Sequence, residues 1–457
     1  HWMVHSFPTR RSSDLVFIMI DKIIGTFLSR LLAMVIMLVV VILNTNTFGA
    51  TGTGTIGLII LGLTILQILG NFIGGAAIVY LIPRRNNFQI IFLSYLWALF
   101  SNIAGVIILT FFHLIPEGYE WQLLLLSLAS SFFFINITVM QGKEDIRRFN
   151  FYQISQLALL IIIYAGILIV FKYTGITPKV SHYIYSFTLS YFLPAAISFI
   201  YIIRNVGEVH FKNIRTLLVE MSKFGAWVQL ANLAQLMNYR LSYYFIEWYA
   251  GRQPLGIYEL GTKLSEVVWI FPKSICLVQY ARLANNRDSQ YAKQLTLSLL
   301  KIVFIFAILA VTCLLLIPES WLAGIFGAEF GASKSVIFRL APGIVFLSCL
   351  SILAHYFSGY GKYWINTLAS LCGLLVTLVL GLLLIPQAAA IGTLRAIEVA
   401  ASINSISYFV SFLFTLLFFI FATKSRFSEF ILNKHDILLF KKEVIGGLLS
   451  RLKHKKA

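Results

Sequence analysis

Runs of about twenty apolar residues recur along the whole chain, and this pattern limits the possible folds more than any other feature. A helix of ~20 apolar residues crosses the hydrocarbon core of a bilayer. Of the 457 residues, 59% are hydrophobic and 12% are charged, whereas a soluble domain carries about 25% charged residues. The sequence therefore predicts an all-α membrane protein with many spans.

Twelve membrane spans are expected, joined by short loops. Pro83, Pro116, Pro318 and Pro386 each follow an apolar run, where a helix is expected to stop. The expected spans are residues 22–43, 55–80, 89–112, 122–140, 151–171, 183–203, 225–248, 257–281, 296–317, 335–357, 365–385 and 391–421.

Lys and Arg are divided unevenly between the two sets of loops. If the N-terminus lies in the cytoplasm, the cytoplasmic segments hold 22 of these residues and the outer segments hold only Lys172, Lys179, Arg252 and Lys334. Such an excess is typical of cytoplasmic loops. The sequence therefore predicts that both termini are cytoplasmic. The same excess explains most of the formal net charge of +18 without a nucleic-acid partner.

The spans divide into two sets of six. We expect an N-lobe at residues 16–203, a basic cytoplasmic connector at 204–224 and a C-lobe at 225–421. The basic tail, residues 422–457, mixes apolar and cationic residues, so it is either a helix on the membrane surface or a solvated segment. Residues 1–15 resemble translated sequencing adapter, and we expect them to be a non-native leader, with a native start near Met19.

A glycine pattern indicates an internal duplication of these two halves. The pattern G-x-x-x-x-G-x-x-x-x-G follows the first span and recurs after the seventh, 199 residues later. Glycines at such entries allow tight turns and close helix contacts. A parallel repeat of six spans would place a substrate site between the lobes. The glycines concerned are Gly52, Gly57, Gly62, Gly251, Gly256 and Gly261.

The eighth span carries four ionisable residues: Glu259, Lys263, Glu266 and Lys273. Their spacing places all four on one face of a helix. A charge in mid-bilayer costs about 2.5–3.5 kcal/mol, so such residues pair with each other or face a water-filled cavity. Both interpretations remain open for Glu259 and Glu266, which either form structural ion pairs or line a cavity.

Cations deep in other spans favour an anionic substrate. Arg30 lies in the first span and Arg240 in the seventh, where polar residues recur every three or four positions. With Lys263 and Lys273 they outnumber the two carboxylates of the eighth span, and Arg binds phosphate well. In the last span, Arg395 and Glu398 are spaced to pair with each other.

Three stretches resemble the polysaccharide flippases of the multidrug/oligosaccharidyl-lipid/polysaccharide exporter superfamily. They are FGATGTGTIGLIILGLTILQILGNFIGGAAIVYLIPR, PLGIYELGTKLSEVVWIFPKSICLVQYARLA and GYGKYWINTLASLCGLLVTLVLGLLLIP. The resemblance implies a multi-pass protein of the bacterial inner membrane, with two six-helix lobes around a central cavity that opens alternately to either side. It also implies that Arg30, Lys263 and Lys273 bind a lipid-linked oligosaccharide. Many relatives have Asp where this chain has Ser242, which argues against ion coupling at that position.

Three functions remain in competition at this stage. The first is a flippase for undecaprenyl-pyrophosphate-linked O-antigen or capsule units, with membrane lipids and the polymerase and chain-length proteins of the pathway as partners. The second is a multidrug exporter of the same superfamily, which the surplus of cations opposes. The third is a membrane-embedded polysaccharide polymerase or glycosyltransferase, which the absence of a metal-ligand spacing or nucleophile motif disfavours. No cofactor is expected, and a coupling ion, Na⁺ or H⁺, stays open.

Overall fold

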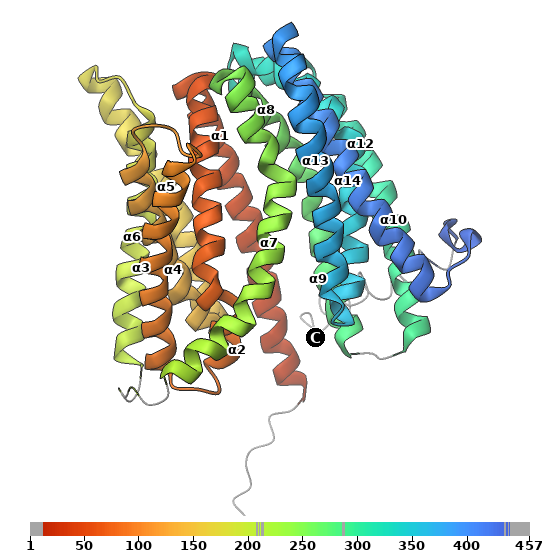
Figure 1. Cartoon of the computed structure of the whole chain (residues 1–457). Helices are drawn as coiled ribbons and strands as arrows, with labels where there is room; N and C mark the ends of the chain where they lie inside the picture. The colour runs from red at the N-terminus through yellow and green to blue at the C-terminus, as the bar shows by residue number, and fades with distance from the viewer. Residues whose placement is uncertain are drawn as a thin grey trace, which may run out of the picture.

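The computed structural model describes the backbone of residues 12–206, 209, 211, 214–285, 288–433, 436 and 438, without the side chains of 12–31, 224, 226, 227, 277, 281, 284 and 285. The described residues form an all-helical bundle without a strand (Figure 1). Its helices are α1 (Ser12–Gly70), α2 (Gly75–Leu81), α3 (Asn87–Phe111), α4 (Glu120–Gly142), α5 (Ile146–Thr174), α6 (Val180–Arg204), α7 (Ile214–Ala250), α8 (Arg252–Glu266), α9 (Ile270–Asn285), α10 (Ser289–Leu315), α11 (Glu319–Phe326), α12 (Ser333–Gly359), α13 (Tyr363–Ile391) and α14 (Thr393–Thr423), with 3-10 turns η1 (Asn71–Ile73), η2 (Val267–Trp269), η3 (Ala328–Ala332) and η4 (Phe427–Phe430).

The long helix α1 contains the first two expected spans. Its helical backbone is interrupted at Gly49, which has a φ of 62° that L-residues with a side chain rarely adopt. In Figure 1 the chain rises through the first part of α1 and descends through the second. We call the end of the bundle that carries Gly49 the upper end and the opposite end the lower end.

The observed helices confirm the prediction of a polytopic all-α protein. Nine described helical stretches, the longest of them Leu32–Leu81, are long and apolar enough to cross a membrane. The remaining predicted crossings are occupied by the second part of α1, by α7, and by α8 together with α9. Of these, α7 and the α8–α9 pair carry the charged and polar residues. The stop predicted at Pro386 is wrong, because α13 continues through it to Ile391.

Large apolar side chains cover the outside of both lobes. On α3, Phe100, Ile107 and Phe111 are more than 60% exposed, and on α13 Leu375 and Leu383 are more than half exposed. In water, contiguous patches of this kind are rare on a monomer. They are the faces that a helical membrane protein presents to lipid.

Helix α7 joins the two lobes: the N-lobe comprises α1–α6, and the C-lobe comprises α8–α14 together with α7 from residue 225 onward. Figure 1 shows it running diagonally from the lower end of the N-lobe to the upper end of the C-lobe. Its first turns bury Leu217 and Met221 in the N-lobe core, and Arg85 pairs with Glu220 at 3.1 Å. Residues 214–224, which belong to the predicted connector, thus form the first part of this helix and pack on the N-lobe.

The two halves meet at the upper end in a symmetric crossing of α1 and α8. A Cβ at Gly54 would lie 2.2 Å from the carbonyl oxygen of Arg252, and a Cβ at Gly256 would lie 1.9 Å from that of Ala50. Gly54 therefore contacts the residue four positions before Gly256, and Gly256 contacts the residue four positions before Gly54. This local symmetry pairs Gly54 with Gly256, whereas the predicted repeat paired Gly57 with Gly256, so the observed register differs from the predicted one by three positions.

Backbone geometry supports the observed register. Gly49 and Gly251, which have the same separation as Gly54 and Gly256, both have positive φ and extended ψ where the helix direction changes. The expected partner of Gly251 was Gly52, which instead lies inside the helix against Phe48. Spacing between glycines alone could not separate those that turn the chain from those that pack inside α1.

Candidate functional site

Glu329 connects the two lobes at the upper end. It lies in η3 of the C-lobe, and its Oε2 accepts a 2.8 Å hydrogen bond from the backbone N–H of Ala50 at the start of the second part of α1. Its Oε1 accepts a 3.0 Å bond from Gln253 on α8. A carboxylate at a helix N-terminus is favoured by the exposed N–H groups there. Below it, Ala50, Leu260 and Phe330 share a buried apolar cluster.

Glu259 lies in the contact between α1 and α8. Its side chain is 2% exposed, and Lys263 Nζ is 2.5 Å from its Oε1. Its Oε2 has no hydrogen-bond partner among the described residues and faces Gly57, where a Cβ would lie only 2.0 Å away. The side chain of Lys263 is 32% exposed. The carboxylate thus fills the space that a glycine leaves on the opposite lobe.

A second ion pair joins α7 to α8 inside the C-lobe. Arg240 Nη2 donates a 2.8 Å hydrogen bond to Glu266 Oε2, and Nη1 lies 2.8 Å from Oε1 of the same carboxylate. The guanidinium also lies 5.2 Å from the ring centre of Tyr243. Because Glu266 neutralises Arg240, this arginine does not contribute to the predicted surplus of cations.

Lys273 has a different environment. Helix α8 gives way to the 3-10 turn η2 before α9 begins, and Lys273 lies in the first turn of α9. Its side chain is exposed, with Nζ 5.0 Å from the ring centre of Trp269. Within the described residues, no ion pair to a carboxylate involves it. Among the described residues, Lys273 is therefore a cation without a carboxylate partner, and its binding of an anion stays a prediction.

The polar stripe predicted on α7 has two parts. Asn238 and Ser242 are buried and bonded to α14: the Ser407 hydroxyl donates to Asn238 Oδ1 at 2.5 Å, and Ser242 donates to Asn404 at 2.6 Å. Nearer the lower end, Asn232 and Gln235 are exposed. The buried part holds the C-lobe together and does not line a cavity, because its hydrogen bonds are used within that lobe.

The remaining predicted residues lie apart from the α8 pairs. Arg395 and Glu398 pair at 3.3 Å on the upper part of α14, and Arg339 of α12 approaches the same carboxylate at 3.9 Å. Arg30 belongs to α1, but its side chain lies outside the described residues. Its role therefore stays a prediction.

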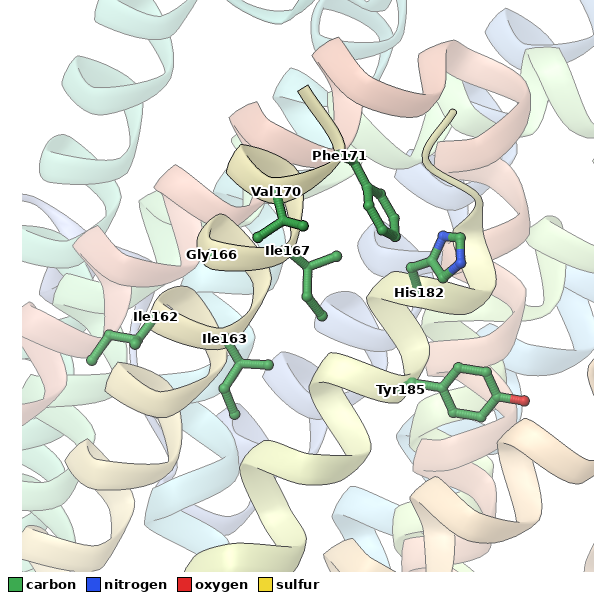
Figure 2. Close-up of a pocket in the computed structure, with 8 residues that line it drawn as sticks. All are labelled: Ile162, Ile163, Gly166, Ile167, Val170, Phe171, His182 and Tyr185. Atoms are coloured by element: carbon green, nitrogen blue, oxygen red, sulfur yellow. The ribbon is translucent and has the colours of Figure 1, made fainter. Parts of the chain in front are cut away.

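Two of the hollows in the described part of the structure lie away from the α8 pairs. One is an apolar pocket between the upper parts of α5 and α6, where His182 lies across from Ile167 and Phe171 (Figure 2). The other adjoins the Arg339–Glu398 contact. Neither is lined by Glu259, Lys263 or Lys273. The central cavity expected between the lobes therefore stays a prediction as well.

Two contacts were missed by sequence reasoning. Glu329 acts on a residue in the opposite half of the chain, and its sequence surroundings offered no signal for this beyond a carboxylate in an outer loop. In the tail, Asp436 is 4% exposed and accepts hydrogen bonds from Ser298 at 2.5 Å and Lys301 at 2.8 Å. The tail segment around η4 is thereby attached to α10, as the Lys293–Glu429 pair at 2.7 Å also shows.

Comparisons with known proteins agree with this architecture. No protein-family model matches the chain. A segment of 162 residues is 25% identical to the capsular polysaccharide biosynthesis protein CapF of Staphylococcus aureus, covering 35% of this chain and 41% of that protein. Because the match spans less than half of CapF, it does not transfer the function of the whole relative.

Solved structures match over nearly the whole chain. The lipid II flippase MurJ in an inward closed conformation has a TM-score of 0.68 at 14% identity, covering 95% of this chain and 97% of MurJ. An inward-facing multidrug resistance MATE transporter has a TM-score of 0.65 at 16% identity, covering 90% and 98%. Its outward-facing counterpart scores 0.60 at 14% identity, covering 89% and 97%. The chain therefore has the fold shared by the MurJ flippase and the MATE transporters of the MOP superfamily.

Proposed function

We propose that this protein is a flippase that moves undecaprenyl-pyrophosphate-linked oligosaccharide units, from O-antigen or capsule synthesis, across a bacterial inner membrane by alternating access. The observation that carries the proposal is the likeness to a lipid II flippase over 95% of the chain. The partial likeness to a capsular polysaccharide biosynthesis protein supports the same class of substrate.

The cations of the eighth span are the proposed contacts of the anionic headgroup. Lys273 is exposed and has no carboxylate partner among the described residues, and Lys263 keeps 32% of its side chain accessible. An ammonium binds phosphate oxygens as a point charge. Arg30 is proposed as a third contact on the basis of its position in the first span. Arg240 holds α7 against α8 through Glu266 and is proposed as a positioning residue.

The positive-inside rule gives the proposed orientation. The lower end, where α7 begins and α14 ends, faces the cytoplasm together with both termini, and the upper end faces outward. The closed crossing of α1 and α8 then separates the headgroup site from the outer leaflet. In this orientation, the proposed substrate would enter from the cytoplasmic side. A polymerase and chain-length proteins would use the product on the other side.

Complementation of a flippase-null strain tests the proposal. The double substitution Lys263→Ala and Lys273→Ala should abolish surface polysaccharide staining while the protein remains in the membrane. The matched control is Lys172→Ala with Lys179→Ala, which removes the same charge from the upper end of the N-lobe. Normal staining with the first pair would contradict the proposed headgroup contacts.

The multidrug exporter interpretation rests on the MATE structures, of which the inward-facing one has a TM-score of 0.65. The same strains separate the two functions. A flippase restores polysaccharide display and leaves drug susceptibility unchanged, whereas an exporter does the reverse. A polymerase or glycosyltransferase would instead lengthen the glycan without moving it, which gel analysis of the lipid-linked product detects.

A further inference from the structure

The unpartnered oxygen of Glu259 suggests a link between the proposed headgroup site and the upper contact of the lobes. The two oxygens of this carboxylate have different surroundings, one in the proposed headgroup site and one in the contact between the lobes. One of its oxygens holds Lys263, a proposed headgroup contact, and the other faces Gly57 of the opposite lobe. A buried charge is tolerated when it is paired, and is costly when its partner leaves.

In the part of the chain that the structure describes, Lys263 is the cation that forms an ion pair with Glu259. The second part of α1 carries no charged or histidine residue between Ala50 and Gly70. Two titratable groups of other elements that interact electrostatically with Glu259 are Tyr183 on α6 and Tyr243 on α7, and neither carries positive charge. Lys263 alone among the described residues balances this carboxylate at ion-pair distance.

We propose that an anionic headgroup competes with Glu259 for the ammonium of Lys263, and that loss of this ion pair opens the upper contact between α1 and α8. When a diphosphate takes Lys263, the carboxylate remains buried against Gly57 without a counter-charge. Separation of α8 from α1 lets water reach it. Glu259 is thus a positioning residue that couples headgroup binding to opening, and the inference rests on the proposed function.

The geometry makes this coupling specific to one helix pair. Gly57 lies one turn below the Gly54–Gly256 crossing, so a change at Glu259 acts directly on the closest contact between the lobes. Arg240 and Glu266 cannot act in the same way, because both belong to the C-lobe side of this contact and remain paired whether the lobes meet or separate.

Distance measurements by double electron–electron resonance test the coupling. Spin labels at Glu117 and Ser320, both exposed at the upper end of different lobes, would report the separation in nanodiscs after the four native cysteines are replaced. In the unsubstituted protein, inorganic pyrophosphate should increase the population with the longer distance. Glu259→Asp keeps the charge and should keep this response, whereas Glu259→Gln should abolish it.

Lys263→Met should increase the population with the longer distance even without pyrophosphate, and it tests whether Glu259 has only a structural role. It leaves the carboxylate unpaired without any ligand, so the ratio of open to closed molecules should rise about tenfold and stop responding to pyrophosphate. An unchanged ratio in Lys263→Met, or a normal response in Glu259→Gln, would overturn the inference.

Calorimetry on the same labelled protein separates this inference from the proposed function. If pyrophosphate binds but the distances do not change, the coupling is wrong and headgroup recognition stands. If pyrophosphate does not bind, headgroup recognition by these lysines and the coupling that rests on it are both wrong.

Discussion

Replacing Gly256 with alanine should open the upper contact of the lobes without touching any charged residue. The added Cβ would lie 1.9 Å from the carbonyl oxygen of Ala50 and 2.9 Å from the backbone nitrogen of Gly54. Ordinary van der Waals contact begins near 3.4 Å, so α1 and α8 must separate locally until the first of these distances reaches that value. Backbone atoms on both sides leave no flexible side chain to move away.

The energetic cost follows from what this separation disrupts. The hydrogen bond from Ala50 to Glu329 is 2.8 Å long. If it lengthens by the difference between 1.9 Å and 3.4 Å, its atoms lie beyond hydrogen-bonding distance. A hydrogen bond to a charged group contributes about 1.5–3 kcal/mol, less here because Glu329 is exposed. With the strain of an overpacked contact, about 1–3 kcal/mol, we expect the closed state to lose ~2 kcal/mol. The ratio of open to closed molecules should then rise about 30-fold.

Alkylation of a single cysteine measures this shift. Thr53 is 4% exposed and lies on the same face of α1 as Ala50, Gly54 and Gly57. In a background without the native cysteines, Thr53→Cys should react with a membrane-impermeant maleimide about 30 times faster when Gly256→Ala is present.

The control for this experiment is Gly324→Ala on α11. A Cβ at Gly324 meets no atom within 4 Å, so the same substitution at the upper end should leave the rate unchanged. Equal rates for Gly256→Ala and Gly324→Ala in folded protein would refute the argument that close glycine contact keeps the upper end closed.

Three further predictions concern the C-lobe and the tail. Arg240→Leu should lower thermal stability by ~1–3 kcal/mol, whereas Arg240→Leu with Glu266→Leu should restore most of it, because the single change leaves a part-buried carboxylate unpaired; a thermal melt in detergent measures both. Asn404→Ala should cost about 1–3 kcal/mol by the same assay, since Asn404 bonds both α7 and α8. Burial raises the pKa of Asp436, but hydrogen bonds from Lys301 and Ser298 outweigh it and the net pKa lies below the usual value. The contact of Asp436 with α10 therefore stabilises the tail above the usual pKa of an aspartate, and this stabilisation is lost as pH falls through the lowered pKa. Protease cleavage of the tail should accelerate in that acid range, and Asp436→Asn should remove the pH dependence.

The helices themselves could be predicted from the sequence because apolar runs of membrane length have few alternatives. Even the polar spans α7 and α8–α9 were expected where they occur, since their charges are spaced on one face. What could not be predicted is how far α7 extends. Residues 214–224 carry basic residues, but apolar residues recur among them three or four positions apart, which gives the helix an apolar face. Leu217 and Met221 lie on that face and pack on the N-lobe.

The candidate site was predictable to the extent that its pairs are local. Glu259 with Lys263, and Arg395 with Glu398, are separated by four and three positions, and both pairs form. Pairs between helices were not predictable, because the choice of Glu266 for Arg240 depends on the rotation of α7 against α8. The contact of Glu329 with Ala50 depends on the packing of two lobes and has no local signal.

The charges of the eighth span now have a physical explanation. Of its four ionisable residues, three are paired within the C-lobe, which lowers the cost of placing them in a bilayer. Pairing by itself would explain a rigid C-lobe and nothing more. It does not explain why the carboxylate of Glu259 faces a glycine on the other lobe, or why Lys273 is exposed without a carboxylate partner among the described residues. These two features are expected if the span both binds an anion and senses the contact between the lobes, which is the combination that alternating access requires.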